Sequence, residues 1–235
     1  TIIEDKTVPN LKELQERQPS TKSALGQALN LQGFDPDADI ATQIRLDSMK
    51  EAAISYGARG GLAYRTREIM KYLDENGDAI DQSFNFRELL IPAPSNLLIE
   101  PPIISESLNA FIVSNEGDTA AVSDVIYNIS RQAQIVSAPR DWRQYLWRQW
   151  DNELDPPPDL LLPETDDERK LWRQWVREGW NSGLEQADSI FEADLNLLVA
   201  DFEGMVRYRV LLAEDKVSSP FAIIEDRGIT GGGDE

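Results

Sequence analysis

Two aspartates, Asp194 and Asp201, stand seven residues apart in a stretch where apolar residues recur every three or four positions. On a helix, this spacing brings both carboxylates to the apolar side, where a buried carboxylate needs a partner. A salt bridge to a core arginine, such as Arg65, Arg67 or Arg131, would supply one. The alternative is a pair of carboxylates acting on a glycosidic bond. We favour salt bridges, because no motif typical of a catalytic cleft accompanies the aspartates.

The inventory of other reactive side chains is short, because the 235 residues contain no histidine and no cysteine. Histidine is the commonest general base and metal ligand, and cysteine supplies thiolates and disulfides. A Ser–His–Asp triad, a zinc hydrolase and a haem protein are therefore excluded, while the redox compartment stays undetermined. Residues 74–85 begin like a calcium loop, but Ala79 replaces the required glycine and Asn85 the bidentate glutamate. We expect no catalytic, cofactor or metal site.

Five of the six tryptophans lie within residues 142–175, and Trp180 follows one turn later. We favour a small core in which a helix at 139–150 packs on the start of a longer helix. A protein interface is the second interpretation, because tryptophan and arginine are enriched at interface hot spots, and carbohydrate stacking is the third. The interface candidates are aromatic residues of this cluster and prolines of an extended stretch upstream: Trp142, Tyr145, Trp147, Trp150, Pro92, Pro94, Pro101 and Pro102.

The acidic composition of the chain limits the kinds of molecule that it can bind. The sequence has 42 acidic against 23 basic residues, a net charge of −19, which repels phosphate backbones. We therefore expect no direct contact with nucleic acid. A hydrophobic content of 41% predicts a folded core, yet no apolar run reaches the roughly 18 residues that a membrane-spanning helix needs. The chain begins at Thr1 rather than Met, and we expect any targeting segment to lie upstream.

A very long helix must carry both aspartates. Residues 165–168 have the sequence of a capping box, in which a threonine hydroxyl and a glutamate satisfy the first amide groups of a helix. No proline follows until Pro220, so the sequence predicts one helix from Thr165 to Ala213. Such a helix exceeds the diameter of a small domain, and we expect it to pack on a second long element, on a partner chain, or on both.

A second long helix is predicted at 40–73, where small residues cluster in the middle. Each glycine inside a helix costs about 1 kcal/mol relative to alanine, so close approach of another helix is the simplest reason for keeping them. The small residues of the 165–213 helix are the natural counterpart. The predicted contact joins the cluster Ala52, Ala53, Gly57, Gly60, Gly61 and Ala63 to Gly179, Gly183 and Ala187.

Shorter elements are predicted between the two long helices along the sequence. A short helix is predicted at 84–89, and residues 91–106, with four prolines, must run extended. Apolar residues alternate at 110–114 and 125–135 around a turn at 116–118, which is typical of a β-hairpin. Because two strands alone are marginally stable, a third is expected from 221–226 or from another chain.

The predicted fold is therefore α+β, with two long packed helices, a Trp-rich helix and a small antiparallel β-sheet. Residues 1–38 are interrupted by prolines and predict an extended N-terminal arm, with a short helix near 12–17. The arm is expected to be a flexible tether, and docking on a neighbouring chain is the alternative. Residues 39–235 are expected to form a single domain.

Short segments between about residues 42 and 233 form an ordered set. The set consists of Pro139 with 142–147, then 161–163, 178–180, 201–202 with 204–205, 208–209 with 211–213, 217–218 with Pro220, and Gly228 with 230–231 and Gly233, and the helix around 57–65 also fits. In its order and spacing this set resembles the DotC family. DotC is the lipoprotein of the Dot/Icm type IVB secretion system, and its counterpart in IncI-type conjugation systems is called TraI.

This resemblance implies an outer-membrane lipoprotein on the periplasmic face, anchored through an acylated N-terminal cysteine. Such proteins are not enzymes; they build the outer-membrane core complex with DotD-like and DotH-like subunits, and copies of the chain are expected in a ring. The lipid-bearing cysteine would lie upstream of Thr1, and family members continue beyond Gly233. Two other hypotheses stay open: a periplasmic glycan-acting enzyme that uses Asp194 and Asp201, and a soluble monomeric binding module.

Overall fold

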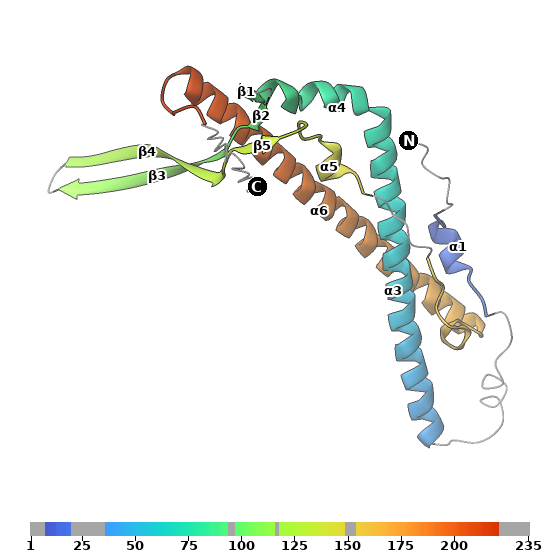
Figure 1. The fold of residues 1–235 in the computed structure, drawn as a ribbon. Coiled ribbons are helices and arrows are strands. Elements are labelled where there is room, and N and C mark those ends of the chain that lie inside the picture. The colour runs from blue at the N-terminus through green and yellow to red at the C-terminus, as the bar shows by residue number, and fades with distance from the viewer. Residues whose placement is uncertain (1–7, 20–35, 94–96, 116–117, 149–153, 221–235) are drawn as a thin grey trace, which may run out of the picture. The chain divides into compact units, whose positions relative to one another are not determined.

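The computed structural model describes residues 8–19, 36–93, 97–115, 118–148 and 154–220 (Figure 1). Helices and antiparallel strands are both present, which confirms the α+β class. By their internal contacts the residues form two compact units. The first unit joins Thr1–Gly77 to Trp147–Asp194, and the second joins Asp78–Leu146 to Leu195–Glu235. The predicted division into an arm at 1–38 and a single domain at 39–235 stays a prediction.

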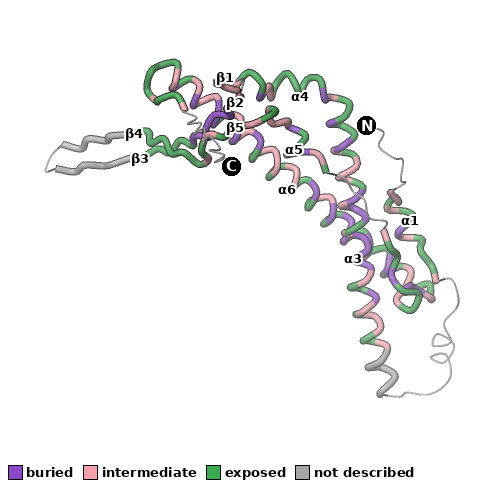
Figure 2. The backbone as a smooth tube through the Cα atoms, viewed as in Figure 1, coloured by how far each residue is buried: buried purple, intermediate pink, exposed green. Residues whose placement is uncertain are grey.

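Two long helices dominate the chain, as the sequence predicts. Helix α3 spans Pro36–Glu75, and helix α6 spans Asp166–Ala213, a run of 48 residues. The predicted capping box opens α6, because the Glu168 amide donates to Thr165 Oγ1 at 3.2 Å and the Thr165 amide donates to Glu168 Oε2 at 3.1 Å. In the first unit, buried residues follow the facing sides of α3 and α6 (Figure 2).

The predicted small-residue contact between these helices is confirmed. A Cβ atom added at any of four glycines would overlap a carbonyl oxygen of the facing helix, so the backbones themselves are in contact. The overlapping pairs are Gly57 with Val176, Gly61 with Trp180, Gly179 with Ile54, and Gly183 with Ala58. The backbone approach explains why α3 tolerates glycine in its interior, where each one lowers helix propensity.

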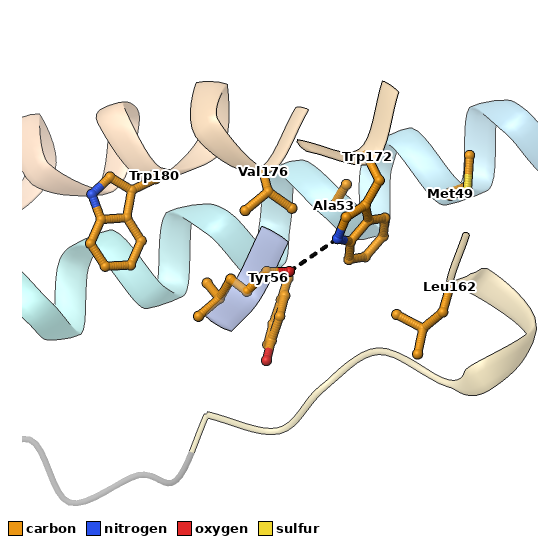
Figure 3. Close-up of a cluster of buried hydrophobic side chains, with 8 residues drawn as sticks. Met49, Ala53, Tyr56, Leu162, Trp172, Val176 and Trp180 are labelled. Atoms are coloured by element: carbon orange, nitrogen blue, oxygen red, sulfur yellow. Dashed lines mark hydrogen bonds between the residues drawn. The ribbon is translucent and has the colours of Figure 1, made fainter. Parts of the chain in front are cut away.

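The core of the first unit surrounds this contact (Figure 3). Trp172 is fully buried there, and its Nε1 donates to the Leu14 carbonyl oxygen at 3.0 Å. Leu14 belongs to α1 (Leu11–Gln15), and the 3-10 helix η3 (Asp159–Leu161) precedes Leu162 at the edge of the core. The buried side chains are Leu14, Met49, Ala53, Tyr56, Leu162, Trp172, Val176 and Trp180.

Residues 8–19 of the expected N-terminal arm are not an extended tether, because they contain a helix that packs on the first unit. Residues 8–19 contain α1, whose Asn10 and Glu13 form a capping box, and this confirms a short helix close to the predicted position. Leu14 is completely buried against α3 and α6 of the same chain. The physical reason is the pair of apolar residues Leu11 and Leu14, which share a helix face three residues apart and fit this core.

The second unit contains two small sheets. A three-stranded antiparallel sheet has the order β1 (Ile91–Ala93), β2 (Leu97–Glu100) and β5 (Gln134–Val136). The predicted extended stretch at 91–106 therefore supplies strands. The predicted hairpin is present and longer than expected, with β3 at Ile103–Asn115 and β4 at Asp118–Arg131. The expected third strand at 221–226 lies outside the described residues.

Short helices complete the second unit, and two of them differ from expectation. The Trp-rich helix was expected at 139–150, but α5 covers Arg143–Leu146. The residues before it are held by long-range contacts instead, since Arg140 binds Asp201 and Trp142 binds Asp81. Helix α4 (Gly77–Ser83) follows α3 after a single residue, within the stretch 74–83 for which the sequence analysis predicts no helix. The predicted helix at 84–89 is a 3-10 helix, η1, at Phe86–Leu89.

Candidate assembly site

Asp201 lies in a buried cluster of charges in the second unit. Arg140 Nη1 donates to Asp201 Oδ2 at 3.0 Å, and the Tyr145 hydroxyl donates to the same oxygen at 2.8 Å. Arg140 also binds Glu100, with Nε 2.8 Å from both carboxylate oxygens. Arg131 Nη1 approaches Asp201 Oδ2 at 3.4 Å, which confirms one of the predicted arginine partners. We call Glu100, Arg131, Arg140, Tyr145 and Asp201 the Arg140 cluster.

The electrostatics of the Arg140 cluster favour the charged arginine and the neutral tyrosine. Burial lowers the pKa of Arg140, but hydrogen bonds to Glu100 and Tyr145 raise this pKa more, so the net pKa lies above its ordinary value. Burial, with the hydrogen bond to Asp201, raises the pKa of the Tyr145 hydroxyl. The cluster therefore places two arginines and a tyrosine around two buried carboxylates, and it connects β2, β4, α5 with the segment before it, and α6.

Asp194 has a simpler partner in the first unit. Arg148 Nε lies 2.7 Å from Asp194 Oδ2, and Arg148 Nη2 lies 2.9 Å from Oδ1, so the pair is bidentate. The predicted partner Arg65 binds Asp188 instead, with Nε 2.7 Å from Oδ1. The prediction that both aspartates form salt bridges is confirmed, although Arg140 and Arg148 were not among the arginines expected.

The aromatic interface candidates are largely engaged within the chain. Trp142 is 1% exposed, and its Nε1 donates to Asp81 Oδ1 at 2.5 Å. The Arg143 guanidinium stacks over the Trp142 ring, 4.3 Å from the ring centre, and also binds Asp81. Hydrogen bonds from Arg143 and from Trp142 hold the pKa of Asp81 below its ordinary value. Tyr145 is half-buried in the Arg140 cluster, and Trp147 is half-buried in the first unit.

The proline candidates differ in exposure. Pro101 and Pro102 are buried, whereas Pro92 is exposed on β1. Pro94 and Trp150 lie outside the described residues. An interface role for the candidate set stays a prediction, but Trp142, Pro101 and Pro102 have almost no free surface to offer a partner. Burial of these three residues against their own chain is the physical reason.

The hairpin β3–β4 carries the exposed apolar surface that the sequence interpretation did not single out. Four large apolar side chains on its described part are about half exposed or more: Leu108 72%, Tyr127 47%, Ile129 55% and Val125 43%. The alternation of Val125, Tyr127 and Ile129 was visible in the sequence and indicated one face of a strand. Whether that face is covered could not be judged, because this depends on the elements that fold onto it.

The base of the hairpin is fixed to the C-terminal part of α6. Arg207 Nη1 donates to the Ile104 carbonyl oxygen at 2.7 Å, and Arg207 Nε lies 3.2 Å from Glu106 Oε2. Ile104 is buried with Tyr208 and Leu211. Beside this contact an open groove of about 590 Å³ runs between the hairpin and α6, lined among others by Tyr127, Val206, Val210 and Lys216.

No described helix is both long enough and apolar enough to cross a membrane. Within the same residues, no group of three or more acidic side chains is arranged to hold a metal ion.

The sequence matches a class of proteins of the type IV secretory system that act in conjugal DNA–protein transfer, over residues 43–235. The matching family is the TraI family of that system, and because the match covers most of the chain, the chain belongs to it. The resemblance to the TraI counterpart of conjugation systems is thereby confirmed. No curated protein matches the chain.

Proposed function

We propose that this chain is a structural lipoprotein subunit of the outer-membrane core complex of a type IVB secretion or conjugation system. The observation that carries the proposal is the family match over residues 43–235, which makes the chain a component of a type IV secretory system. The finer role, without catalysis and with DotD-like and DotH-like partners, follows from the resemblance to the DotC family. Copies of the chain form a ring in this proposal.

The ion pairs of the two aspartates support a structural role. Asp194 and Asp201 are the two carboxylates with the best case for acid–base work, and each is bound by an arginine in its own unit. A carboxylate that neutralises a buried arginine stabilises the fold, and its removal leaves a buried charge without a partner. No contact favours the glycan-acting alternative. The net charge of −19 supports a role without direct contact to DNA.

The location in this proposal is the periplasmic face of the outer membrane. A lipid attached to a cysteine upstream of Thr1 provides the anchor, and the described helices are too polar to provide one. The folded units then act as an assembly platform, for which the glycine-packed helix pair of the first unit and the long hairpin of the second unit are suitable parts.

The test is the composition of the native assembly. The full-length protein is tagged in its own host, outer membranes are separated by density, and the complex is extracted with mild detergent. We expect the protein in the outer-membrane fraction with DotD-like and DotH-like chains, identified by mass spectrometry. Recovery in the soluble periplasmic fraction without these chains would contradict the proposal.

A second assay addresses catalysis. Purified peptidoglycan is incubated with the wild-type protein and with the Asp194→Asn and Asp201→Asn variants, and released soluble sugar is measured. We expect no release above the buffer background from any of the three proteins. Release by the wild type that both variants lose would instead support the glycan-acting enzyme.

A further inference from the structure

No other described strand pairs with the outer edges of the hairpin β3–β4. Among the described residues, β3 pairs only with β4, and β4 only with β3, in a sheet of two strands. Each strand therefore presents a row of amide and carbonyl groups on its outer side, along 13 residues of β3 and 14 of β4. Such an edge is a template for pairing with another strand.

The sequence of the hairpin lacks the usual protection of strand edges. Natural proteins block an edge with lysine, proline, a bulge or a covering element. Neither lysine nor proline occurs in 103–115 or 118–131, and the one register shift lies at the base, between Ile103 and Ile104. Because an isolated two-stranded hairpin is marginally stable in water, these long strands need a further partner.

The two faces of the hairpin differ in polarity. Directly paired residues share a face, so Leu108 with Val125 and Glu106 with Tyr127 lie on one face. The other face carries Ser105 with Asn128 and Ser107 with Ile126. Ser105 Oγ donates to the Asn128 carbonyl oxygen at 3.3 Å, and Ser107 Oγ donates to the Ile126 carbonyl oxygen at 3.5 Å. One face is thus largely apolar, and the hydroxyl groups of the other face are satisfied within the hairpin.

Charge on the described part of the hairpin does not select a partner of opposite sign. Among residues 104–108 and 125–129, the one charged residue is Glu106, and Arg207 of the same chain neutralises it at 3.2 Å. These ten residues therefore neither attract a strongly basic partner nor oppose a second copy, although β4 also carries Asp118 and Asp124 and the whole chain carries −19.

We propose that the outer edge of β4 in one copy pairs, antiparallel, with the outer edge of β3 in a neighbouring copy. The contact is between two different edges, and a contact between unlike surfaces is the kind that closes a ring of identical subunits. When the hairpins lie side by side in this way, every apolar face turns to the same side. The inference rests on the proposed function, which places copies of the chain in a ring.

The size of the contact agrees with this kind of pairing. Strands of 13 residues are about 44 Å long at ~3.4 Å per residue, and adjacent strands lie about 4.8 Å apart. Main-chain pairing over this length supplies on the order of ten hydrogen bonds, as many as a typical stable interface carries.

Disulfide trapping between copies tests the pairing, because the chain contains no cysteine of its own. Two full-length variants are expressed in the same cell. One carries Ser105→Cys or Ser107→Cys on β3, and the other carries Ile126→Cys or Asn128→Cys on β4. All four positions lie on the polar face, so the apolar face is unchanged. The complex is extracted, oxidised, and analysed for cross-linked dimers without reducing agent.

We expect dimers between the β3 variant and the β4 variant to exceed dimers of either variant with itself by at least about fivefold in the best combination. A disulfide requires Cβ atoms within about 4.5 Å, whereas like strands of neighbouring copies lie about two strand spacings apart, near 10 Å. Leu108→Cys, expressed alone, is the control on the apolar face, and it should form no dimer.

Three other outcomes would overturn the pairing. Self-dimers of Leu108→Cys without β3–β4 dimers would indicate that hairpins pack face to face. A multi-copy particle without any cross-link would leave the proposed function standing and remove the hairpin contact. A particle with a single copy of the chain would contradict the ring and the pairing together. The mass of the particle, measured before oxidation, separates the last two outcomes.

Discussion

Asp194 and Asp201 stand on the same helix, and each binds an arginine, yet the two units hold them differently. The Asp194 side chain is 20% exposed, and its partner Arg148 is 53% exposed. The Asp201 side chain is 9% exposed, its partner Arg140 is 18% exposed, and Tyr145 adds a hydrogen bond. An exposed ion pair contributes little to stability, whereas breaking a buried one leaves a charge without water or partner.

The difference extends to the units themselves. The first unit is held by direct contact between helix backbones at glycines and by a buried core around Trp172. In the second unit, the Arg140 cluster joins β2 and the segment before α5 to α6. A packed core is destabilised by a change in side-chain volume, whereas a buried cluster of charges is destabilised when one partner is removed.

Replacement of Arg140 should have the largest effect. Arg140→Met removes the cation between Glu100 and Asp201, which are 4% and 7% exposed. We expect a loss of about 3–5 kcal/mol in the free energy of unfolding, measured by urea denaturation. The matched control is Arg148→Met in the first unit, with an expected loss of about 0–1 kcal/mol. Equal losses in the two variants would contradict the distinction between the two ion pairs.

Replacement of Gly179 tests the backbone contact in the first unit. In an exposed helix, Gly→Ala stabilises by about 1 kcal/mol. Gly179→Ala should instead destabilise by about 1–3 kcal/mol, because the new methyl group would overlap the Ile54 carbonyl oxygen. Asn181→Ala, at an exposed position of the same helix, should not destabilise by more than about 0.5 kcal/mol. A gain in stability for Gly179→Ala, measured by thermal unfolding, would show that the helices can separate.

Replacement of one tryptophan in each unit by phenylalanine compares how much an indole hydrogen bond contributes to the stability of that unit. Trp172→Phe removes the donor to the Leu14 carbonyl oxygen, and Trp142→Phe removes the donor to Asp81. Each should cost about 1–2 kcal/mol. Hydrogen exchange should locate the effects, with lost protection in α1 for Trp172→Phe and around α5 for Trp142→Phe. Unchanged protection of α1 in Trp172→Phe would mean that Leu14 is held by other contacts.

The smallest effect is a dependence on pH at the start of α6. Burial raises the pKa of Glu168, but hydrogen bonds from the Glu164 and Thr165 amides and from Arg45 outweigh it, so the folded pKa lies below the ordinary value of 4.5. The ionised glutamate therefore contributes stability above that value, and the contribution is lost as the pH falls through the folded pKa. Stability should fall as the pH is lowered below about 4.5, less steeply in Glu168→Gln than in the wild type. Identical slopes in urea denaturation would contradict this assignment.

Much of the fold could be predicted because its signals are local. The capping box at Thr165 and the absence of proline before Pro220 fixed the limits of α6, and the glycines of α3 indicated a close helix contact. The hairpin was predicted from alternating apolar residues around a turn. The Trp-rich helix was predicted too long, because the burial of Trp142 and its bond to Asp81 are long-range contacts that override local helix propensity.

The candidate site could be predicted only in part. Salt bridges for Asp194 and Asp201 follow from the cost of burying a carboxylate, but the choice of Arg140 and Arg148 depends on how distant segments meet. Trp142, Pro101 and Pro102 were chosen by residue type alone, and residue type does not distinguish a partner's surface from the chain's own core. The exposed hairpin face depends on what covers it, which is a property of the folded chain.

The mass of the native particle extracted from outer membranes tests the central claim most directly. Native mass spectrometry or mass photometry of the gently solubilised complex gives its total mass and, with the chains identified, the number of copies of each. The structural account predicts a large particle with several copies of this chain, accompanied by DotD-like and DotH-like subunits. A single copy that migrates alone would contradict that account.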